Sequence, residues 1–290
     1  MTVLDAEEAR NLVKQSLTTK NPGAVQIPEV TKIPGDVKFH SVTGIGAGAF
    51  KNCNELISIH FPNTVTDIGK EAFSGCRLLT SVQIPSKVTR IGEAAFHDCI
   101  GLTSIEIPDN VTEIGQLAFH GCTRLTSVQI SNSVTHISQQ VFAKCIGLTS
   151  VSIPESVSEI GREAFIGCAG LTTLQIPRSP TNGAVSEQDA SPAEACDTEA
   201  GAKGLTKIGD GAFDGCTGLT SVQIPDSTTK IGAHAFRDCR GLTKVDVRGD
   251  WNNLEFGSEA FAGCTSLPEE FVGALDLSRS EGCCDGCIVF

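Results

Sequence analysis

The sequence predicts a repeat solenoid, in which short parallel strands form a continuous sheet and turns with short helical turns cover the other side. Three observations predict it: a recurring phenylalanine, a cysteine three residues after it, and a leucine three residues after that cysteine. A unit of roughly 23 residues cannot bury its own apolar edge, so successive units bury it by stacking. The phenylalanines are Phe50, Phe73, Phe96, Phe119, Phe142, Phe165, Phe213, Phe236 and Phe261.

The first half of each unit is expected to be a strand. In the segment 79–85, Val82 and Ile84 are apolar and alternate with polar residues, which is the pattern of a half-buried strand. Pro85 has no backbone N–H and therefore ends the pairing. Stacked units would join these strands into one parallel sheet.

The second half of each unit is expected to turn the chain back. Most units carry a glycine such as Gly92, which lets the backbone turn tightly. The segment 93–99 is then predicted to form a helical turn whose Ala95, Phe96 and Cys99 face inward as one apolar stripe. Phenylalanine and cysteine would thus fill the inside of the solenoid.

This unit resembles the BspA-type leucine-rich repeats, also described as the leucine-rich repeat 5 group, whose units read much like IGxxAFxxCxxLTSVxIPxSVTx. The resemblance covers about residues 45–267. Ser131 and Ser138 stand where most units have proline and glycine, and Thr228 stands where most have valine, which affects local geometry only. The resemblance implies a curved or twisted leucine-rich-repeat solenoid that makes protein–protein or surface-adhesion contacts, and it names no single partner.

Three regions follow from this pattern. Residues 1–20 contain an N-terminal capping helix, predicted at 4–17 with acidic residues early and a lysine late, which suits the helix dipole. Residues 21–267 form the leucine-rich-repeat solenoid of about nine coils. An acidic insert at about 178–203, rich in Ala, Ser and Pro, interrupts it and is expected to be disordered. Residues 268–290 form a C-terminal cap and lipidation tail.

Stacking in register would bring equivalent residues of successive units into columns on the surface. One column changes charge from unit to unit and is a candidate surface for a protein partner, although drift also produces such variation. A second column, on the exposed sheet face, is small and polar, whereas binding hot spots favour Trp, Tyr and Arg. The mixed-charge column contains Asp67, Arg90, Glu113, His136, Glu159, Lys207 and Lys230, and the polar column includes Gln83, Glu106 and Gln129.

Composition limits the partners and the compartment. The net charge of -12 provides no basic surface for phosphate groups, so nucleic acid is not an expected partner. The first residues lack the basic and apolar stretches of a secretory signal, and no run of 18 apolar residues occurs. We therefore expect a cytoplasmic protein whose cysteines are reduced thiols.

The last four residues match a prenylation motif. Cys287 is followed by two aliphatic residues and a terminal phenylalanine, which favours a geranylgeranyl group. One prenyl chain anchors weakly, and Cys283 and Cys284 are candidate palmitoylation sites that would supply a second anchor. The sequence thus predicts a tether to the cytoplasmic face of a membrane, with an accidental match as the alternative.

No metal, cofactor or catalytic site is expected. The cysteines are interpreted as buried thiols, because cysteine is a common apolar filler and a metal would need only four ligands in one place. His97 and His120 share a position in adjacent units, but other units place unrelated residues there, which favours coincidence. No P-loop, triad order, zinc-protease motif or Rossmann fingerprint occurs.

The main hypothesis is therefore a non-enzymatic leucine-rich-repeat scaffold for protein–protein interaction, tethered to a membrane by its tail. The alternative is a structural or adhesin-like spacer that selects no single partner. A third class, an enzyme or metal protein that uses the cysteine or histidine columns, has the weakest support in the sequence.

Overall fold

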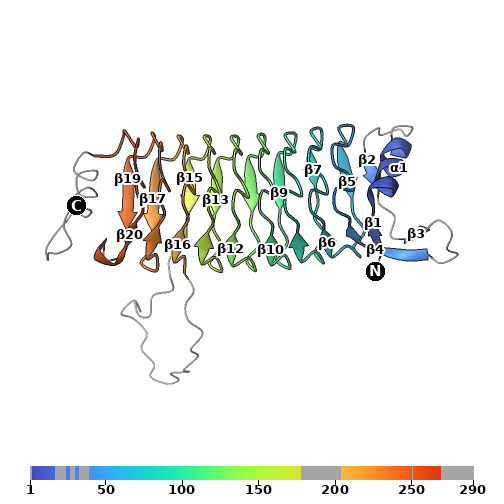
Figure 1. The fold of residues 1–290 in the computed structure, drawn as a ribbon, viewed down its shortest axis with the longest axis horizontal. Coiled ribbons are helices and arrows are strands. Elements are labelled where there is room, and N and C mark those ends of the chain that lie inside the picture. The colour runs from blue at the N-terminus through green and yellow to red at the C-terminus, as the bar shows by residue number, and fades with distance from the viewer. Residues whose placement is uncertain are drawn as a thin grey trace, which may run out of the picture.

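The protein is an elongated array of stacked coils with one short helix at its N-terminal end (Figure 1). The computed structural model describes residues 2–16, 24–26, 30–32, 39–177, 204–249 and 251–268. The predicted insert at 178–203 and most of the region 268–290 lie outside these residues. No helix in the described part is long and apolar enough to cross a membrane.

The first strand of each repeat joins a parallel sheet, here called sheet 1. Ser104, Ser127 and Ser150 pair as neighbouring rungs, so each repeat adds one rung in register. Inward residues are apolar and outward residues polar, as the alternation predicts. The strands are β2 (Ala24–Gln26), β5 (Ser58–His60), β7 (Ser81–Val82), β9 (Ser104–Glu106), β11 (Ser127–Gln129), β13 (Ser150–Ser152), β15 (Thr173–Gln175), β17 (Ser221–Ile224) and β19 (Lys244–Val247).

The second strand of each repeat forms another parallel sheet, sheet 2, whose rungs are mostly two residues long. A short strand, β3 (Val30–Lys32), pairs antiparallel with β4 at the N-terminal end. The parallel strands are β1 (Thr2–Leu4), β4 (Phe39–Ile45), β6 (Asp67–Ile68), β8 (Arg90–Ile91), β10 (Glu113–Ile114), β12 (His136–Ile137), β14 (Glu159–Ile160), β16 (Lys207–Ile208), β18 (Lys230–Ile231) and β20 (Glu255–Phe256).

Each sheet is interrupted once, and the two interruptions fall at different repeats. In the described residues, sheet 2 has no pairing between β10 and β12, and sheet 1 has none between β15 and β17. At the first interruption β9, β11 and β13 continue sheet 1, and at the second β14 and β16 continue sheet 2. The array therefore stays continuous across the step that contains the insert.

The third side of each repeat consists of turns, and here the structure differs from the predicted helical turn. Two residues per repeat have positive φ, for example Ala94 at 52° and Asp98 at 55°, and a right-handed helix does not accommodate them. The N–H groups of Ala94, Phe96 and Asp98 instead donate to carbonyl oxygens of the next repeat, each at 2.8 Å. Ala95, Phe96 and Cys99 are nevertheless fully buried, as predicted.

The recurring phenylalanines stack face to face along the whole array. Their eight consecutive pairs have ring centroids 5.1–5.5 Å apart and interplanar angles of at most 17°. Phe165 and Phe213, which flank the insert, are 5.2 Å apart and nearly parallel. Stacking of this kind contributes about 0.5–1.5 kcal/mol per pair beyond the burial of apolar surface. The predicted core and solenoid are confirmed.

The cysteines have a second role besides filling space. Sγ of Cys122 donates to the carbonyl oxygen of Phe96 in the preceding repeat at 3.2 Å. The same bond recurs in eight repeats, from Cys76 to Cys264. Eight of these thiols are buried and Cys53 is half-buried. The predicted buried thiols are thus confirmed, and each also gives a phenylalanine carbonyl a hydrogen-bond donor.

Hydroxyl groups compensate where the sequence departs from its own repeat. Ser131, in place of proline, donates to the carbonyl oxygen of Val111 at 2.7 Å. Thr228, in place of valine, donates to that of Leu205 at 2.9 Å. Both residues are buried, and both hydroxyls therefore have the partner that a buried polar group requires.

Ser138 lies where sheet 2 is interrupted. In the two preceding repeats Gly92 and Gly115 donate their backbone N–H to the repeat before, at 2.7 and 2.8 Å. At Ser138 the side-chain hydroxyl donates to the carbonyl oxygen of Ile114 instead. A serine Cβ needs room that a glycine does not. At this point of sheet 2, a side-chain hydrogen bond therefore takes the place of the backbone hydrogen bond to the preceding repeat.

The N-terminal helix predicted from the sequence is confirmed as α1 (Ala6–Ser16). Asp5 caps it, because Oδ1 accepts the N–H groups of Glu7 and Glu8 at 2.9 Å each. Ala9 and Val13 are buried in the same apolar core as the repeats. The strand β1, which precedes the helix and pairs with β4, was not foreseen from the sequence.

Replacing Phe119 with alanine should lower the free energy of unfolding by about 3–5 kcal/mol, because the ring is fully buried and stacked on both sides. Trp251→Ala, at a side chain that is 36% exposed, should cost less. Urea unfolding followed by circular dichroism measures both changes. Equal losses would contradict a core that depends on the phenylalanine column.

Candidate functional site

Sheet 2 carries the predicted mixed-charge column. Its short strands pair in parallel register, so residues from successive repeats lie side by side although they are 23 or more positions apart in the sequence. Glu255 extends the column at the C-terminal end, where it pairs with Lys230. The regular spacing did not predict this residue because the last coil is longer by two residues. The paired runs are Asp67, Arg90 and Glu113, then His136, Glu159, Lys207, Lys230 and Glu255.

Much of the charge in this column is compensated between neighbouring repeats. Nε of Arg90 lies 2.8 Å from Oδ1 of Asp67, and this hydrogen bond raises the pKa of the Arg90 guanidinium. Nζ of Lys207 lies 2.7 Å from Oε1 of Glu159. Such exposed pairs contribute roughly 0–1 kcal/mol each. They set the charge pattern that a partner meets more than they stabilise the fold.

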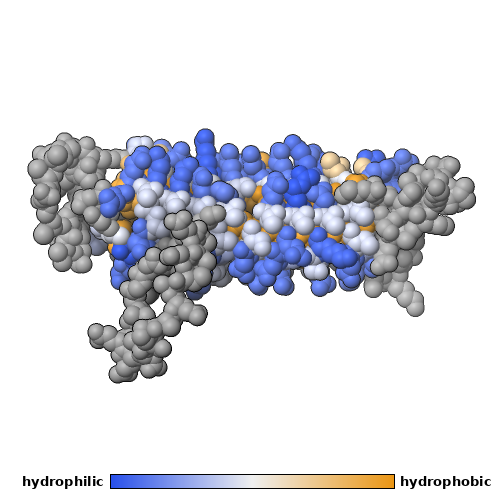
Figure 2. All heavy atoms as spheres, turned by 90° about the horizontal axis from the view of Figure 1, so that it is seen from below, coloured by the Kyte–Doolittle hydropathy of each residue, from blue (hydrophilic) through white to orange (hydrophobic). Residues whose placement is uncertain are grey.

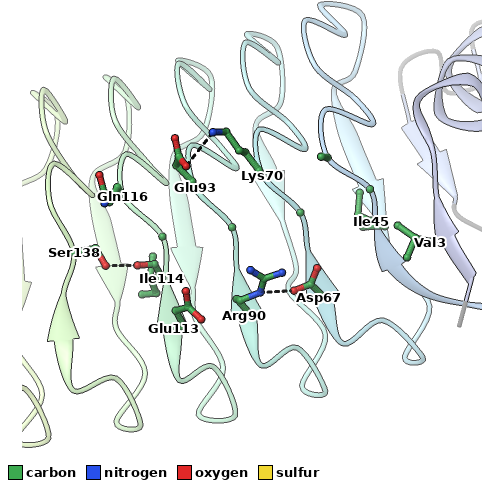
Figure 3. A pocket seen from close by; sticks show the side chains of 15 residues that line it. Val3, Ile45, Asp67, Lys70, Arg90, Glu93, Glu113, Ile114, Gln116 and Ser138 are labelled. Carbon is green, nitrogen blue, oxygen red and sulfur yellow. Dashed lines mark hydrogen bonds and ion pairs between the residues drawn. The ribbon is translucent and has the colours of Figure 1, made fainter.

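A groove of about 630 Å³ crosses the N-terminal half of sheet 2 (Figure 3). Its walls are two rows of side chains, with Asp67, Arg90 and Glu113 in one row and Lys70, Glu93 and Gln116 in the other. A column of glycines between the rows forms its floor, and Ser138 is the last residue of that column to line it. The glycines are Gly46, Gly69, Gly92 and Gly115.

Close approach between repeats explains these glycines. A Cβ on Gly92 would lie 2.6 Å from backbone atoms of Gly69 and Lys70, and one on Gly115 would lie 2.4 Å from the backbone nitrogen of Glu93. The sequence suggested a tight turn as the reason for glycine, but neighbouring backbones, rather than a positive φ, exclude larger residues here. The missing side chains leave the groove open.

The two ends of the groove differ in polarity. At one end Val3 is 46% exposed and lies beside Ile45 (Figure 3). At the other end Glu113 is exposed, and its carboxylate makes no ion pair or hydrogen bond with any described residue. Between the ends, Arg90 with Asp67 and Lys70 with Glu93 form ion pairs of 2.8 and 3.0 Å. The groove therefore has an apolar end and an acidic end.

The predicted polar column lies exposed on sheet 1. Gln129 pairs with Glu106 in register, and Gln83 is exposed in the preceding repeat. The Glu106 carboxylate, like that of Glu113, has no ion pair among the residues that the structure describes. From below, the array shows a pale band of weakly polar residues bordered by rows of polar and charged ones (Figure 2).

A family model for the BspA type leucine-rich repeat region matches residues 36–91, 72–183 and 200–274, in six copies. The chain belongs to the BspA-type leucine-rich-repeat family. The match includes both surface columns and the residues that line the groove, except Val3 at its apolar end. No curated protein matches the chain.

Solved structures similar to this BspA-type chain are bacterial. A leucine-rich repeat protein from Bacteroides ovatus is 25% identical, with 86% of this chain and 74% of that chain covered and a TM-score of 0.44. The Treponema pallidum leucine-rich repeat protein is 22% identical, with 88% and 82% covered and a TM-score of 0.40. The pneumococcal vaccine antigen PcpA is 21% identical, with 84% and 59% covered and a TM-score of 0.54. The likeness to PcpA supports the fold.

Burial holds the thiols in the middle of this BspA-type array in their neutral form. Burial raises the pKa of Cys99 and Cys168 to about 12 each. Burial also raises the pKa of Cys122 and Cys145, which lie between them in the column. The thiolate is the nucleophile and the metal ligand, so these cysteines are unsuited to either chemistry.

The structure brings together two histidines that the sequence left as a coincidence. The rings of His97 and His120 stack with centroids 4.8 Å apart, and Asp98 lies within the same small cluster. By contrast, the predicted lipidation sites Cys283, Cys284 and Cys287 lie outside the described residues, and the tether to a membrane stays a prediction.

The raised thiol pKa values predict that the fold loses stability at alkaline pH. A thiol whose pKa is raised in the folded state stabilises the fold below its unfolded pKa of about 8.5, and this contribution disappears as pH rises through the folded value. We expect the melting temperature to fall between about pH 9 and 12, and to fall less steeply in Cys99→Ala/Cys168→Ala. Scanning calorimetry across this range measures both slopes, and parallel slopes would contradict the prediction.

Proposed function

We propose that this chain is a non-enzymatic binding scaffold that seats an extended segment of a protein partner in the sheet 2 groove. The observation that carries the proposal is the groove's polarity: an exposed apolar side chain, Val3, lies at one end, and the carboxylate of Glu113, which has no ion pair with a described residue, lies at the other. A segment with an apolar residue near one end and a lysine or arginine near the other would complement both. We propose that it runs along the array, across successive repeats.

The charged rows on either side of the groove support an extended partner rather than a compact ligand. Asp67 with Arg90 and Lys70 with Glu93 are already paired, so the middle of the groove presents little net charge. Charge selection would then depend on Glu113 at the acidic end. A glycine floor brings the backbone of a bound segment close to the backbone of the repeats, which suits a chain without bulky inward side chains.

The chemistry of the core supports a binding role over catalysis. The array's repeated nucleophile is cysteine, and burial keeps the pKa of Cys99, Cys122 and Cys168 well above their usual values. A neutral thiol donating to a carbonyl oxygen is a structural group. The family's fold, an extended stack of repeats with long solvent-facing columns, is suited to contact with other macromolecules.

A structural or adhesin-like role without a single partner is the second candidate. The uniformity of the surface favours it: ion pairs cancel most charges along sheet 2, and the column with Gln83, Glu106 and Gln129 is small and polar. Under this alternative the array acts as a rigid spacer, and no substitution in the groove changes binding selectively.

The Glu113→Lys substitution separates the two candidates. Peptides selected against the full chain from a random library should contain a basic and an apolar residue. Their affinity should fall at least tenfold, or roughly 1.4 kcal/mol, in Glu113→Lys, because the basic residue of the peptide would then face a like charge. Titration calorimetry with one selected peptide measures the change.

The matched control is Glu106→Lys, which makes the same charge change in the same repeat but on sheet 1. It should leave the peptide affinity unchanged. If both variants bind the peptide equally well, or if Glu106→Lys alone weakens it, the groove is not the binding surface. A loss of peptide affinity in Glu106→Lys alone would instead favour the polar column on sheet 1 as the binding surface.

We propose in addition that the scaffold is tethered to the cytoplasmic face of a membrane through Cys287, with Cys283 and Cys284 as the second anchor. The motif in the sequence supports this tether. Intact mass spectrometry of protein from its native cells should find a prenyl group on Cys287 and loss of residues 288–290. A cysteine with no lipid at this position would leave a scaffold without a tether.

A further inference from the structure

The residue that follows each column phenylalanine forms a column of its own, here called the Phe+1 column. Neighbours in it touch across repeats. Arg237 and Asp214 are adjacent members and form an ion pair of 2.6 Å. His97 and His120 are adjacent members in the N-terminal half, and their rings stack with an interplanar angle of 2°. Adjacent residues of this column therefore contact each other across the boundary between repeats.

Asp98 adds a carboxylate to the histidine pair. One nitrogen from each ring and one oxygen of Asp98 lie within 4.8 Å of one another, and this is the only such group of three found among the described residues. The Asp98 backbone has a φ of 55°, and a Cβ on Gly121 would lie 2.2 Å from Oδ1 of Asp98. The carboxylate thus extends over the next repeat, the one that carries His120.

His120 has an unmet requirement in this arrangement. Its Nδ1 is buried and has no hydrogen-bond partner. A buried polar atom left unsatisfied costs about 1–3 kcal/mol, and a ligand bound at this nitrogen would remove that cost.

We propose that His97, His120 and Asp98 form a binding site for a divalent transition-metal cation of the zinc type. Two imidazoles and one carboxylate are ligands that such cations prefer, whereas magnesium and calcium prefer oxygen ligands alone. With metal–nitrogen bonds of about 2.0–2.1 Å, tetrahedral ligand atoms lie about 3.3 Å apart. The side chains of His97 and Asp98 are 30% and 46% exposed and so have room to rotate toward that spacing. The open side leaves a position for water or for a group of the partner.

A second place in the array shows which part of the site is specific. Oδ1 of Asp238 also lies over the following repeat, where a Cβ on Gly263 would be 2.7 Å from it. There the Phe+1 residues are Arg237 and Ala262 rather than histidines. The repeat geometry therefore places the carboxylate in the same way at Asp98 and at Asp238. Only the site at Asp98 also has the paired histidines, His97 and His120, that a metal ion requires.

A metal at this site would join two neighbouring repeats. Its ligands come from both sides of the boundary between the third and fourth phenylalanine repeats. A cation that binds the folded array but not the unfolded chain stabilises the fold by mass action, so it should raise the melting temperature. The site is separate from the groove, because none of His97, Asp98 and His120 lines the groove.

The experiment is calorimetric titration of Zn²⁺ into the full chain with Cys196, Cys283, Cys284 and Cys287 changed to serine, because free thiols also bind zinc. We expect one zinc ion per chain and a higher melting temperature with zinc. Affinity should fall at least tenfold in His97→Ala, in His120→Ala and in Asp98→Asn. The control Asp238→Asn, at the matched carboxylate, and His136→Ala, on sheet 2, should bind as the parent does.

Melting curves without metal show whether each variant is folded, and His120→Asn replaces His120→Ala if the smaller side chain unfolds the array. The absorption spectrum of bound Co²⁺ provides an independent measurement and should lack a thiolate charge-transfer band. No saturable zinc binding, binding that survives in His97→Ala/His120→Ala, or a thiolate band would each overturn the proposal.

Discussion

The close stacking of one repeat on the next is the constraint on which the rest of this structure depends. Ring centroids in the phenylalanine column are 5.1–5.5 Å apart, close to the spacing that backbone hydrogen bonds between strands require. Sheet 1, sheet 2 and the turn-side hydrogen bonds all connect successive repeats at this spacing. The hydrogen bonds of the two sheets and of the turns can therefore form together, and the array continues where one sheet is interrupted.

This spacing also explains residues that look unrelated in the sequence. Gly92 and Gly115 are required because neighbouring backbones leave no room for a Cβ. Cysteine suits its position because it is small enough to be buried and its S–H reaches the phenylalanine carbonyl of the preceding repeat. Ser131 and Ser138 show how exceptions are accommodated, since the hydroxyl of each donates to a carbonyl oxygen of the preceding repeat.

Function in such an array depends on differences between repeats rather than on the repeat itself. Most of the surface is uniform, and ion pairs such as Lys207 with Glu159 cancel charge between neighbours. The features that stand out are local: the uncompensated Glu113 at the end of the groove, and the histidine pair with its carboxylate. Both lie in the N-terminal half and both span boundaries between repeats, so a change in the stacking there would affect them together.

The sequence by itself determined the repeat, the buried column of Phe96 and its equivalents, and the burial of the cysteines, because periodic apolar residues specify which side of each unit faces inward. The sequence did not reveal that the turns are non-helical. Ala94 and Asp98 take positive φ, and their N–H groups donate to carbonyl oxygens of the next repeat. Only the tertiary structure decided that Arg90 forms an ion pair with Asp67, that Glu113 forms none with a described residue, and that the rings of His97 and His120 stack. These contacts depend on the register and direction of side chains across repeat boundaries, which residue spacing alone does not specify.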